Sequence, residues 1–434
     1  MPSPSSAPSS VPSDGLRSYA AALAGTLRQL APRRDDWDAA YLRRDLTAGL
    51  MVALVALPLA LGFGVSSWLG AAAGLTTAIV AGALAAVFGG SRVQVSGPTG
   101  AMTVVLVPVV AAYGPGSVLV VGLLAGVVLV ALALAGAGKA IHYVPTPVIE
   151  GFTVGIAAII ALQQVPAGLG VSVPSGKVLA QAFDALTAWV RHPNLVTAGL
   201  TLAVVVAVLA FGRFRPGWPG PLVVVLVATV ANAQLNLGAA TIGAIPAGLP
   251  TPRFPTIGWT ELSTLVLPAL AVAALAALES LLSASVADAL TVGDRHEPDR
   301  ELFGQGVANL VVPLFGGIPA TAAIARTAVN VRSGAVTRLA ALSHALILLV
   351  VALVAARWVA TIPVAALAGV LIATAARMVQ VSSLAPLVRA TRGDAAVLVT
   401  TAAATILTDL VTAVVVGLAL AGFVALRQTA RTAR

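Results

Sequence analysis

Two Phe-Gly-Gly tripeptides, at Phe88-Gly89-Gly90 and Phe315-Gly316-Gly317, interrupt long apolar stretches in corresponding parts of the two halves of the chain. Glycine pairs and the prolines that follow them end a helix, and the small residues beyond allow a new one to begin. Each break therefore predicts a short extended piece followed by a half-helix. Paired interruptions of this kind are typical of a transporter binding site built from inverted repeats.

The apolar stretches themselves require a lipid environment. The chain of 434 residues is 59% hydrophobic and 9% charged, with a mean hydropathy of +0.98. This composition predicts a polytopic membrane protein. The net charge of +9 comes from Lys and Arg between apolar spans, which indicates membrane topology and not nucleic-acid binding. With no Cys and only four His, dispersed in sequence, neither a cofactor nor a metal site is expected.

One arginine, Arg326, lies in the stretch from Phe315 to Thr327, where the second half-helix begins. Each bare helix N-terminus carries about half a positive charge and offers unpaired N–H donors. Two such ends facing each other beside Arg326 would form a cationic pocket for an anion. The alternatives are that the two breaks coincide by chance, or that Arg326 extends to the membrane surface or caps a helix.

We expect fourteen membrane segments, both termini in the cytoplasm and a location in the cell inner (plasma) membrane. Residues 1–44 would be a disordered tail followed by a cytoplasmic interfacial helix over residues 16–44. Residues 45–237 would form the first repeat, 238–261 an extracellular connection, 262–427 the second repeat and 428–434 a tail. An interfacial helix is expected within 175–191. The expected segments are 46–66, 68–89, 98–113 (a half-helix), 117–137, 145–168, 194–212, 219–237, 262–290, 300–315, 319–332 (a half-helix), 336–356, 359–376, 394–409 and 410–427. This count places most Lys and Arg inside, while Lys177, Arg191, Arg253 and Arg357 fall outside.

The chain resembles the sulfate permease (SulP) family of anion transporters. The residues that carry the resemblance are Asp45 to Leu50, Ser96-Gly97-Pro98-Thr99-Gly100, Glu279-Ser280-Leu281-Leu282-Ser283 with Val286-Ala287-Asp288, Asn309 with Phe315 to Thr321, and Thr408-Asp409-Leu410. The resemblance implies an all-α, seven-plus-seven inverted repeat like that of uracil permeases. Segments 1–4 and 8–11 would form a core domain and segments 5–7 and 12–14 a gate domain.

Two departures from the family pattern stand out. Relatives usually continue into a cytoplasmic STAS domain, whereas this sequence ends at Arg434, so we expect the membrane domain without a STAS domain. Many relatives also carry Gln after the proline of the first span, where this chain has Leu59 after Pro58. The first span is therefore expected to contribute shape more than hydrogen bonds.

By this resemblance, substrate would lie between segments three and ten. We expect the substrate-binding residues to be Arg326, Thr99, Gly100, Ala101, Ser96, Thr321, Ala325 and Thr327. Glu279 lies deep in an apolar span, where a carboxylate must be paired or protonated. Ser283 is four residues further on and shares its helical face. Glu279 and Ser283 are therefore the expected coupling residues, unless Glu279 only locks helix packing. Asp45, Asp288 and Asp409 are expected to be structural.

No enzyme motif and no nucleotide-binding loop is present. We therefore expect a secondary transporter, not an enzyme, that moves a small dicarboxylate or sulfate-like anion together with a proton by an elevator movement. The alternatives are sodium-coupled bicarbonate symport and an anion channel or exchanger. Relatives proposed to use sodium tend to carry Asp and Thr where Glu279 and Ser283 stand. Its partners would be the anion, a proton or sodium ion and the lipid bilayer, with a homodimer left open.

Overall fold

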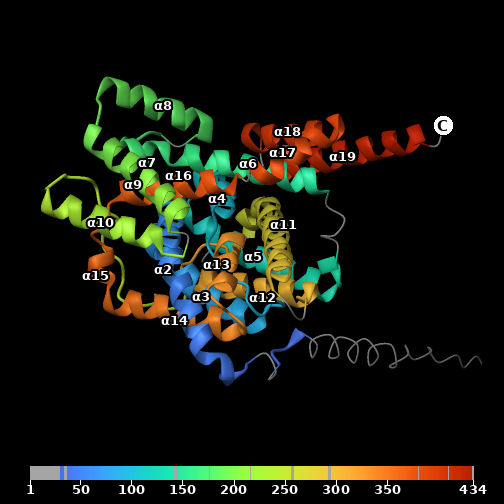
Figure 1. Cartoon of the computed structure of the whole chain (residues 1–434), viewed down its shortest axis with the longest axis horizontal. Coiled ribbons are helices and arrows are strands. Elements are labelled where there is room, and N and C mark those ends of the chain that lie inside the picture. The colour runs from blue at the N-terminus through green and yellow to red at the C-terminus, as the bar shows by residue number, and fades with distance from the viewer. Residues whose placement is uncertain are drawn as a thin grey trace, which may run out of the picture.

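The computed structural model describes residues 30–33, 37–139, 145–174, 176–215, 217–255, 259–291, 295–379, 381–408 and 410–432. These residues are mostly helical (Figure 1). The elements of the first half are η2 (Ala39–Tyr41), α2 (Leu42–Ser66), α3 (Ala71–Phe88), β1 (Ser96–Gly97), α4 (Gly100–Tyr113), α5 (Pro115–Leu134), α6 (Thr146–Gln163), α7 (Val165–Leu169), α8 (Val178–Arg191), α9 (Leu195–Phe214) and α10 (Gly220–Gln234).

The second half, like the first, contains a short strand before a short helix. Its elements are α11 (Trp259–Leu290), α12 (Pro298–Val311), η4 (Val312–Phe315), β2 (Thr321–Ala322), α13 (Ile324–Arg332), α14 (Arg338–Val354), α15 (Ala356–Val359), α16 (Val364–Met378), α17 (Val381–Ala390), α18 (Arg392–Leu407) and α19 (Leu410–Thr432).

Six of the described helices are long and apolar enough to cross a membrane, and four shorter helices are also apolar. These helices are consistent with the polytopic membrane class expected from composition. Small residues let these helices approach closely. A Cβ atom added at Gly64 of α2, for example, would come within 2.7 Å of the backbone N of Gly74 in α3.

The helices gather in two groups. Figure 1 shows α6 to α9 and α16 to α19 in the upper part and α3 and α12 to α14 in the lower part. In the lower group, α14 packs on α2 and α3, and α12 and α11 pack on α5. In the upper group, α18 packs on α6 and α16 packs on α9. Helix α2 also packs on α16 and α10, so it joins the two groups.

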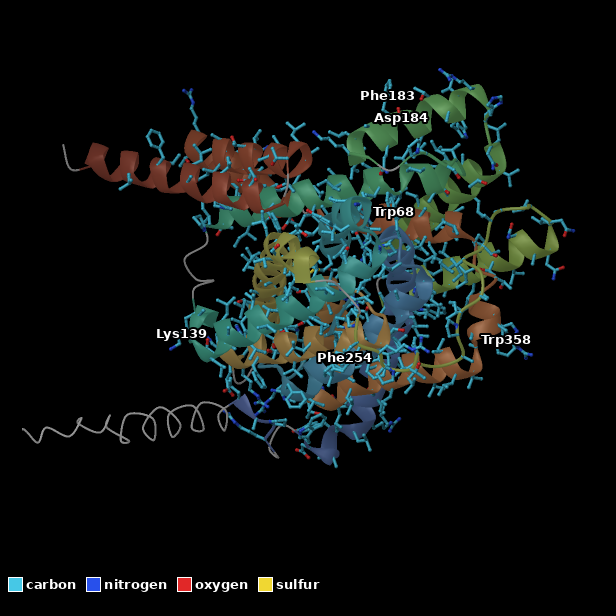
Figure 2. All side chains as sticks on the ribbon, turned by 180° about the vertical axis from the view of Figure 1, so that it is seen from behind. Trp68, Lys139, Phe183, Asp184, Phe254 and Trp358 are labelled. Carbon is cyan, nitrogen blue, oxygen red and sulfur yellow. The ribbon has the colours of Figure 1, made fainter. Side chains whose placement is uncertain are left out.

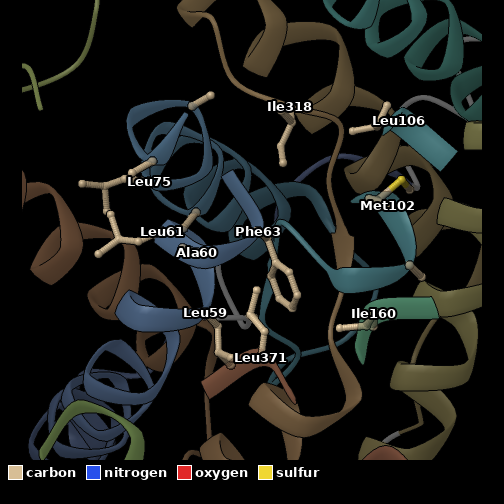
Figure 3. Close-up of a cluster of buried hydrophobic side chains, with 14 of the residues drawn as sticks. Leu59, Ala60, Leu61, Phe63, Leu75, Met102, Leu106, Ile160, Ile318 and Leu371 are labelled. Atoms are coloured by element: carbon tan, nitrogen blue, oxygen red, sulfur yellow. The ribbon is translucent and has the colours of Figure 1, made fainter. Parts of the chain in front are cut away.

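An apolar cluster fills the junction between these groups. Figure 3 shows the Phe63 ring of α2 between Ile160 of α6 and Leu371 of α16. Leu59, one helical turn before Phe63, is buried in the same cluster. The side chain of Leu59 therefore supplies apolar packing at this point of the first span.

The two breaks face each other, as the sequence predicted. Strands β1 and β2 pair antiparallel, with Ser96 opposite Ala322 and Gly97 opposite Thr321. Each strand is two residues long, so β1 and β2 form only a minimal antiparallel pair. Its effect is to hold the starts of α4 and α13 side by side.

Several predicted boundaries were wrong. The second half-helix begins at Ile324 and not at residue 319, because residues 321–322 pair with β1. Helix α17 was not predicted. Helix α2 begins at Leu42, so it includes the last residues of the interfacial helix expected over 16–44. Most of residues 16–44 lie outside the described residues, and so does Asp409. Helix α8 falls where the helix within 175–191 was predicted.

Candidate functional site

The half-helices α4 and α13 begin beside the strand pair. Beyond the paired residues, the backbone N–H of Ala323 donates to the Val95 carbonyl at 3.0 Å. Thr99 caps α4 by accepting a hydrogen bond from the Met102 N–H at 3.3 Å. Ala323 precedes α13 and has no side chain that can cap it. The first N–H groups of α13 are therefore not capped by a side chain.

Arg326 points from the first turn of α13 toward the start of α4. Its Nη2 donates to the Pro98 carbonyl at 2.9 Å, and its side chain is 2% exposed. Its Nη1 is buried without a hydrogen-bond partner. Gly97 makes room for this group, since a Cβ atom there would lie 2.6 Å from Nη1. A buried cationic donor with an unused N–H is the strongest indication of an anion site in the described residues.

Glu279 approaches the same place from α11. The Thr99 hydroxyl donates to Glu279 Oε2 at 2.9 Å. Glu279 also interacts electrostatically with Arg326, although the two side chains form no ion pair within 4.0 Å. The carboxylate is half-buried and the guanidinium is buried. Thr99 therefore links the carboxylate to the start of α4, while Arg326 remains free of a direct salt bridge.

Two serines of α11 fix the segments around the strand pair. Ser280 Oγ lies 2.8 Å from Thr321 Oγ1 and accepts from the Ala322 N–H at 3.2 Å. Ser283 Oγ lies 3.0 Å from Thr327 Oγ1, which also accepts from the Val95 N–H at 3.1 Å. The hydroxyls of Thr321, Thr327 and Ser283 are thus engaged inside the protein.

One face of α12 carries polar residues that sequence reasoning missed as a group. Glu301 accepts from the N–H groups of Gly90 and Ser91 at 2.9 and 3.2 Å. Gln305 Nε2 donates to Ser96 Oγ at 2.6 Å. Asn309 bonds to both backbone groups of Ala320, at 2.8 and 2.9 Å. The four-residue spacing of Glu301, Gln305 and Asn309 is a signal that could have found them.

The two half-helix starts differ in exposure. At α13, Ala325 is exposed and Ile324 is 40% exposed. At α4, Gly100 is buried by the side chains of Ile160 and Phe63. A Cβ atom placed on Gly100 would lie 2.8 Å from Ile160 Cγ1 and 3.1 Å from Phe63 Cε1. Figure 3 shows Phe63 and Ile160 together at this point. The site is therefore covered by apolar side chains at α4 and accessible at α13.

The structure thus brings together some of the predicted residues and engages others elsewhere. Arg326, Thr99 and Glu279 interact around the start of α4, where Gly100 and Ala101 lie, and Ala325 is at the exposed start of α13. The hydroxyls of Ser96, Thr321, Thr327 and Ser283 bond within the scaffold. The carboxylates of Asp45 and Asp288 make hydrogen bonds within the protein, which fits the structural roles expected for them. Asp45 accepts from the N–H groups of Val336 and Thr337, and Asp288 pairs with His296 at 2.7 Å.

No cluster of three or more His, Asp or Glu side chains that could hold a metal occurs among the described residues.

Comparison with known proteins gives concordant results. The sequence model of the sulfate permease family matches residues 42–401. YvdB of Bacillus subtilis (strain 168), provisionally named a sulfate transporter, is 36% identical over 399 residues, which cover 90% of this chain and 75% of that protein. The bicarbonate transporter BicA of Synechocystis sp. is 34% identical, with 76% of this chain and 60% of BicA covered.

Solved structures agree with the fold. The transmembrane domain of a cyanobacterium bicarbonate transporter BicA superposes with a TM-score of 0.77 at 33% identity, covering 89% of this chain and 98% of that domain. The murine anion transporter Slc26a9 in its inward-facing state gives 0.81 at 18% identity, covering 97% of this chain and 73% of Slc26a9, and supports the fold alone.

Proposed function

The chain belongs to the sulfate permease family of anion transporters, and on that premise we propose that it is a secondary active carrier that binds its anion between the starts of α4 and α13. The observation that carries this proposal is the buried Nη1 of Arg326, which has no hydrogen-bond partner in the protein. An anion beside it would receive a charge-assisted hydrogen bond.

The helix starts would add to the attraction. Each contributes about half a positive charge, concentrated in its first turn. At α13 this turn is uncapped by a side chain and partly exposed, so an anion has both donors and access there. Thr99, Gly100 and Ala101 would complete the site from α4 when the covering residues Phe63 and Ile160 move away.

We propose that Glu279 couples the anion to a proton. Ionised Glu279 places a negative charge near Arg326 and opposes anion entry, whereas the protonated form removes that charge. The empty carrier would return with Glu279 ionised, so that neither buried charge stands alone. Its bond to Thr99 would transmit this change to the start of α4. Ser283 would act indirectly, through Thr327 on α13.

The packing of the helices supports an inverted repeat of seven plus seven segments. Matching the segments in order pairs α2 with α11, α3 with α12, α4 with α13 and α5 with α14. The contact of α14 with α3 then corresponds to that of α5 with α12, and the contact of α2 with α13 corresponds to that of α11 with α4. Continuing the order pairs α6 with α16 and α9 with α18. The contact of α6 with α18 therefore corresponds to that of α16 with α9.

The same packing supports a division into a core domain of α2 to α5 and α11 to α14 and a gate domain of the remaining segments. We propose that the core moves as an elevator against the gate, sliding along the apolar junction at Phe63, Ile160 and Leu371. Lys139 and Trp358 lie at opposite sides of the molecule in Figure 2, which suits the proposed cytoplasmic and extracellular positions of these residues in a plasma membrane.

A sulfate-like or dicarboxylate anion is the proposed cargo. Sodium-coupled bicarbonate transport is the second candidate, since both the sequence and the structure resemble the bicarbonate transporter BicA. A channel built on the same site would differ in giving unitary currents.

Uptake of labelled anions into proteoliposomes distinguishes these functions. Sulfate, a dicarboxylate and bicarbonate are each tested under a pH gradient, a sodium gradient or neither. We expect saturable, pH-driven accumulation of sulfate or a dicarboxylate. Sodium-driven bicarbonate uptake would favour the second candidate, and unitary currents would favour a channel. Transport of none of these anions would contradict the proposed function.

A further inference from the structure

A polar cavity lies beside the start of α2, whereas Phe63 in the later part of that helix belongs to the apolar junction. Its volume is about 550 Å³. The lining comes from Arg33, the start of α2, the break after α3, the end of α11 with residues 295–297 beyond it, and both sides of the α13–α14 connection. We call it the arginine pocket, because Arg33, Arg44, Arg92, Arg295 and Arg338 all line it.

We infer that the arginine pocket binds a phosphate group, carried by a soluble phosphate compound or by an anionic phospholipid. Five arginines and two carboxylates are among the described residues that line it, so arginine is the prevailing charged side chain there. Both carboxylates are engaged, Glu297 with Arg33 at 2.8 Å and Asp288 with His296 at 2.7 Å. The inference is independent of which anion the carrier transports.

The lining is held in place by the scaffold. Asp45 accepts hydrogen bonds from the Val336 and Thr337 N–H groups, which fixes the α13–α14 connection against the start of α2. Arg44 extends over Gly334, where an added Cβ would lie 3.9 Å from its Nε and Nη2. Gly334 has φ +94, a conformation that favours glycine. The side chain of Arg44 and the backbone at Gly334 therefore pack together on one side of the pocket.

A buried imidazole gives independent evidence for a ligand. His296 lines the pocket and its side chain is 5% exposed. Asp288 holds it from two sides, accepting from the His296 backbone N–H at 3.0 Å and contacting Nδ1 at 2.7 Å. Its Nε2 is buried without a hydrogen-bond partner. A phosphate oxygen or hydroxyl is a suitable partner for that nitrogen.

A phosphate group fits the pocket better than a small monoanion does. Guanidinium groups bind phosphate in a bidentate manner, and several around one cavity match its multiple charge. The volume lies within the usual range of ligand pockets, about 300–1,000 Å³, which leaves room for more than a single small ion.

The segment after α3 connects the pocket to the transport site. Gly90 to Val93 line the pocket and lie shortly before β1 in the chain. Glu301 holds the N–H groups of Gly90 and Ser91, and Asn330 of α13 donates to the Val93 carbonyl at 2.8 Å. A bound phosphate would therefore stabilise the segment that positions the start of α4.

Binding of two phosphate probes tests the inference. The full chain, purified in detergent, is titrated with inorganic pyrophosphate or with phosphatidylglycerol while its thermal unfolding is followed. The test variant is Arg44→Gln/Arg295→Gln, which removes two exposed arginines of the pocket. The matched control is Arg389→Gln/Arg392→Gln, which removes two exposed arginines from α17 and α18 outside the pocket.

We expect at least one probe to stabilise the wild type and the control, and to bind the test variant at least about tenfold more weakly, since hydrogen bonds to charged groups are lost. A response to pyrophosphate alone identifies a soluble phosphate, and a response to phosphatidylglycerol alone identifies a lipid. No response of the wild type to either probe, or an equal response of the test variant, would overturn the inference.

Discussion

Replacing Arg326 by alanine is expected to abolish anion binding while the protein still folds. Removing one partner of a buried charge pair costs about 3–5 kcal/mol, and each 1.4 kcal/mol is a factor of ten. Anion affinity should thus fall by roughly two to four orders of magnitude. Within the protein the variant loses the electrostatic interaction with Glu279 and one hydrogen bond, from Nη2 to the Pro98 carbonyl. That hydrogen bond contributes about 1.5–3 kcal/mol for a charged donor, which is less than a typical folding stability of about 5–15 kcal/mol.

Anion binding to the purified protein and uptake into proteoliposomes measure the effect. Arg332→Ala is the matched control, because Arg332 is an exposed arginine at the other end of the same helix. If Arg326→Ala fails to fold, the double variant with Glu279→Gln removes the carboxylate that would otherwise be left without its cation, and it should fold without binding anion. Normal transport by a folded Arg326→Ala protein would refute the proposed anion site.

Three further predictions follow from the same contacts. Gly97→Ala should weaken anion binding at least about tenfold, because the new Cβ would lie 2.6 Å from Arg326 Nη1. The control Gly199→Ala should bind the anion normally, since no atom lies within 4 Å of a Cβ placed there. Equal anion affinities of the two variants would contradict this prediction. Asn309→Leu should lower the free energy of unfolding by about 2–6 kcal/mol in a thermal unfolding assay, because both backbone groups of Ala320 lose their partner; an unchanged midpoint would show that those bonds contribute little. A tag at residues 295–300 should be protected from an external reagent and one at 245–255 should react; labelling of both from one side would refute the proposed topology.

The sequence predicted the paired breaks and the central pair of charges well. Helix-breaking Gly and Pro are local signals, and a charged residue in an apolar span has few acceptable surroundings. Both features depend little on packing details. The half-helices and the extended pieces before them could therefore be anticipated from the residues, whereas the approach of Glu279 to the start of α4 was implied by the family resemblance.

The start of α13 could not be predicted, because tertiary contacts decide it. Residues 319–323 include small residues that are compatible with a helix, but Asn309 holds both backbone groups of Ala320 and β1 pairs with the next two residues. Ser280 was missed as a scaffold residue for a similar reason. Its hydroxyl looks like that of Ser283, and only the folded chain distinguishes their partners.

The arginine pocket escaped prediction because its lining comes from five separate parts of the chain. In the sequence, Arg44, Arg92, Arg295 and Arg338 each indicate only the cytoplasmic end of a segment. Their convergence on one cavity depends on the packing of α2, α11, α13 and α14. Charge asymmetry predicts sidedness, but it does not predict which charges share a cavity.

Transport by the Glu279→Gln variant tests the central claim most directly, since it separates anion recognition from proton coupling. Glutamine keeps the size of the side chain and can accept the Thr99 hydrogen bond, but it cannot release a proton. Proteoliposomes are assayed for exchange of labelled against unlabelled anion, and for accumulation driven by an inward proton gradient. We expect exchange to persist, because the loaded carrier still reorients, and gradient-driven accumulation to disappear. Accumulation that still follows the proton gradient in this variant would contradict the role proposed for Glu279.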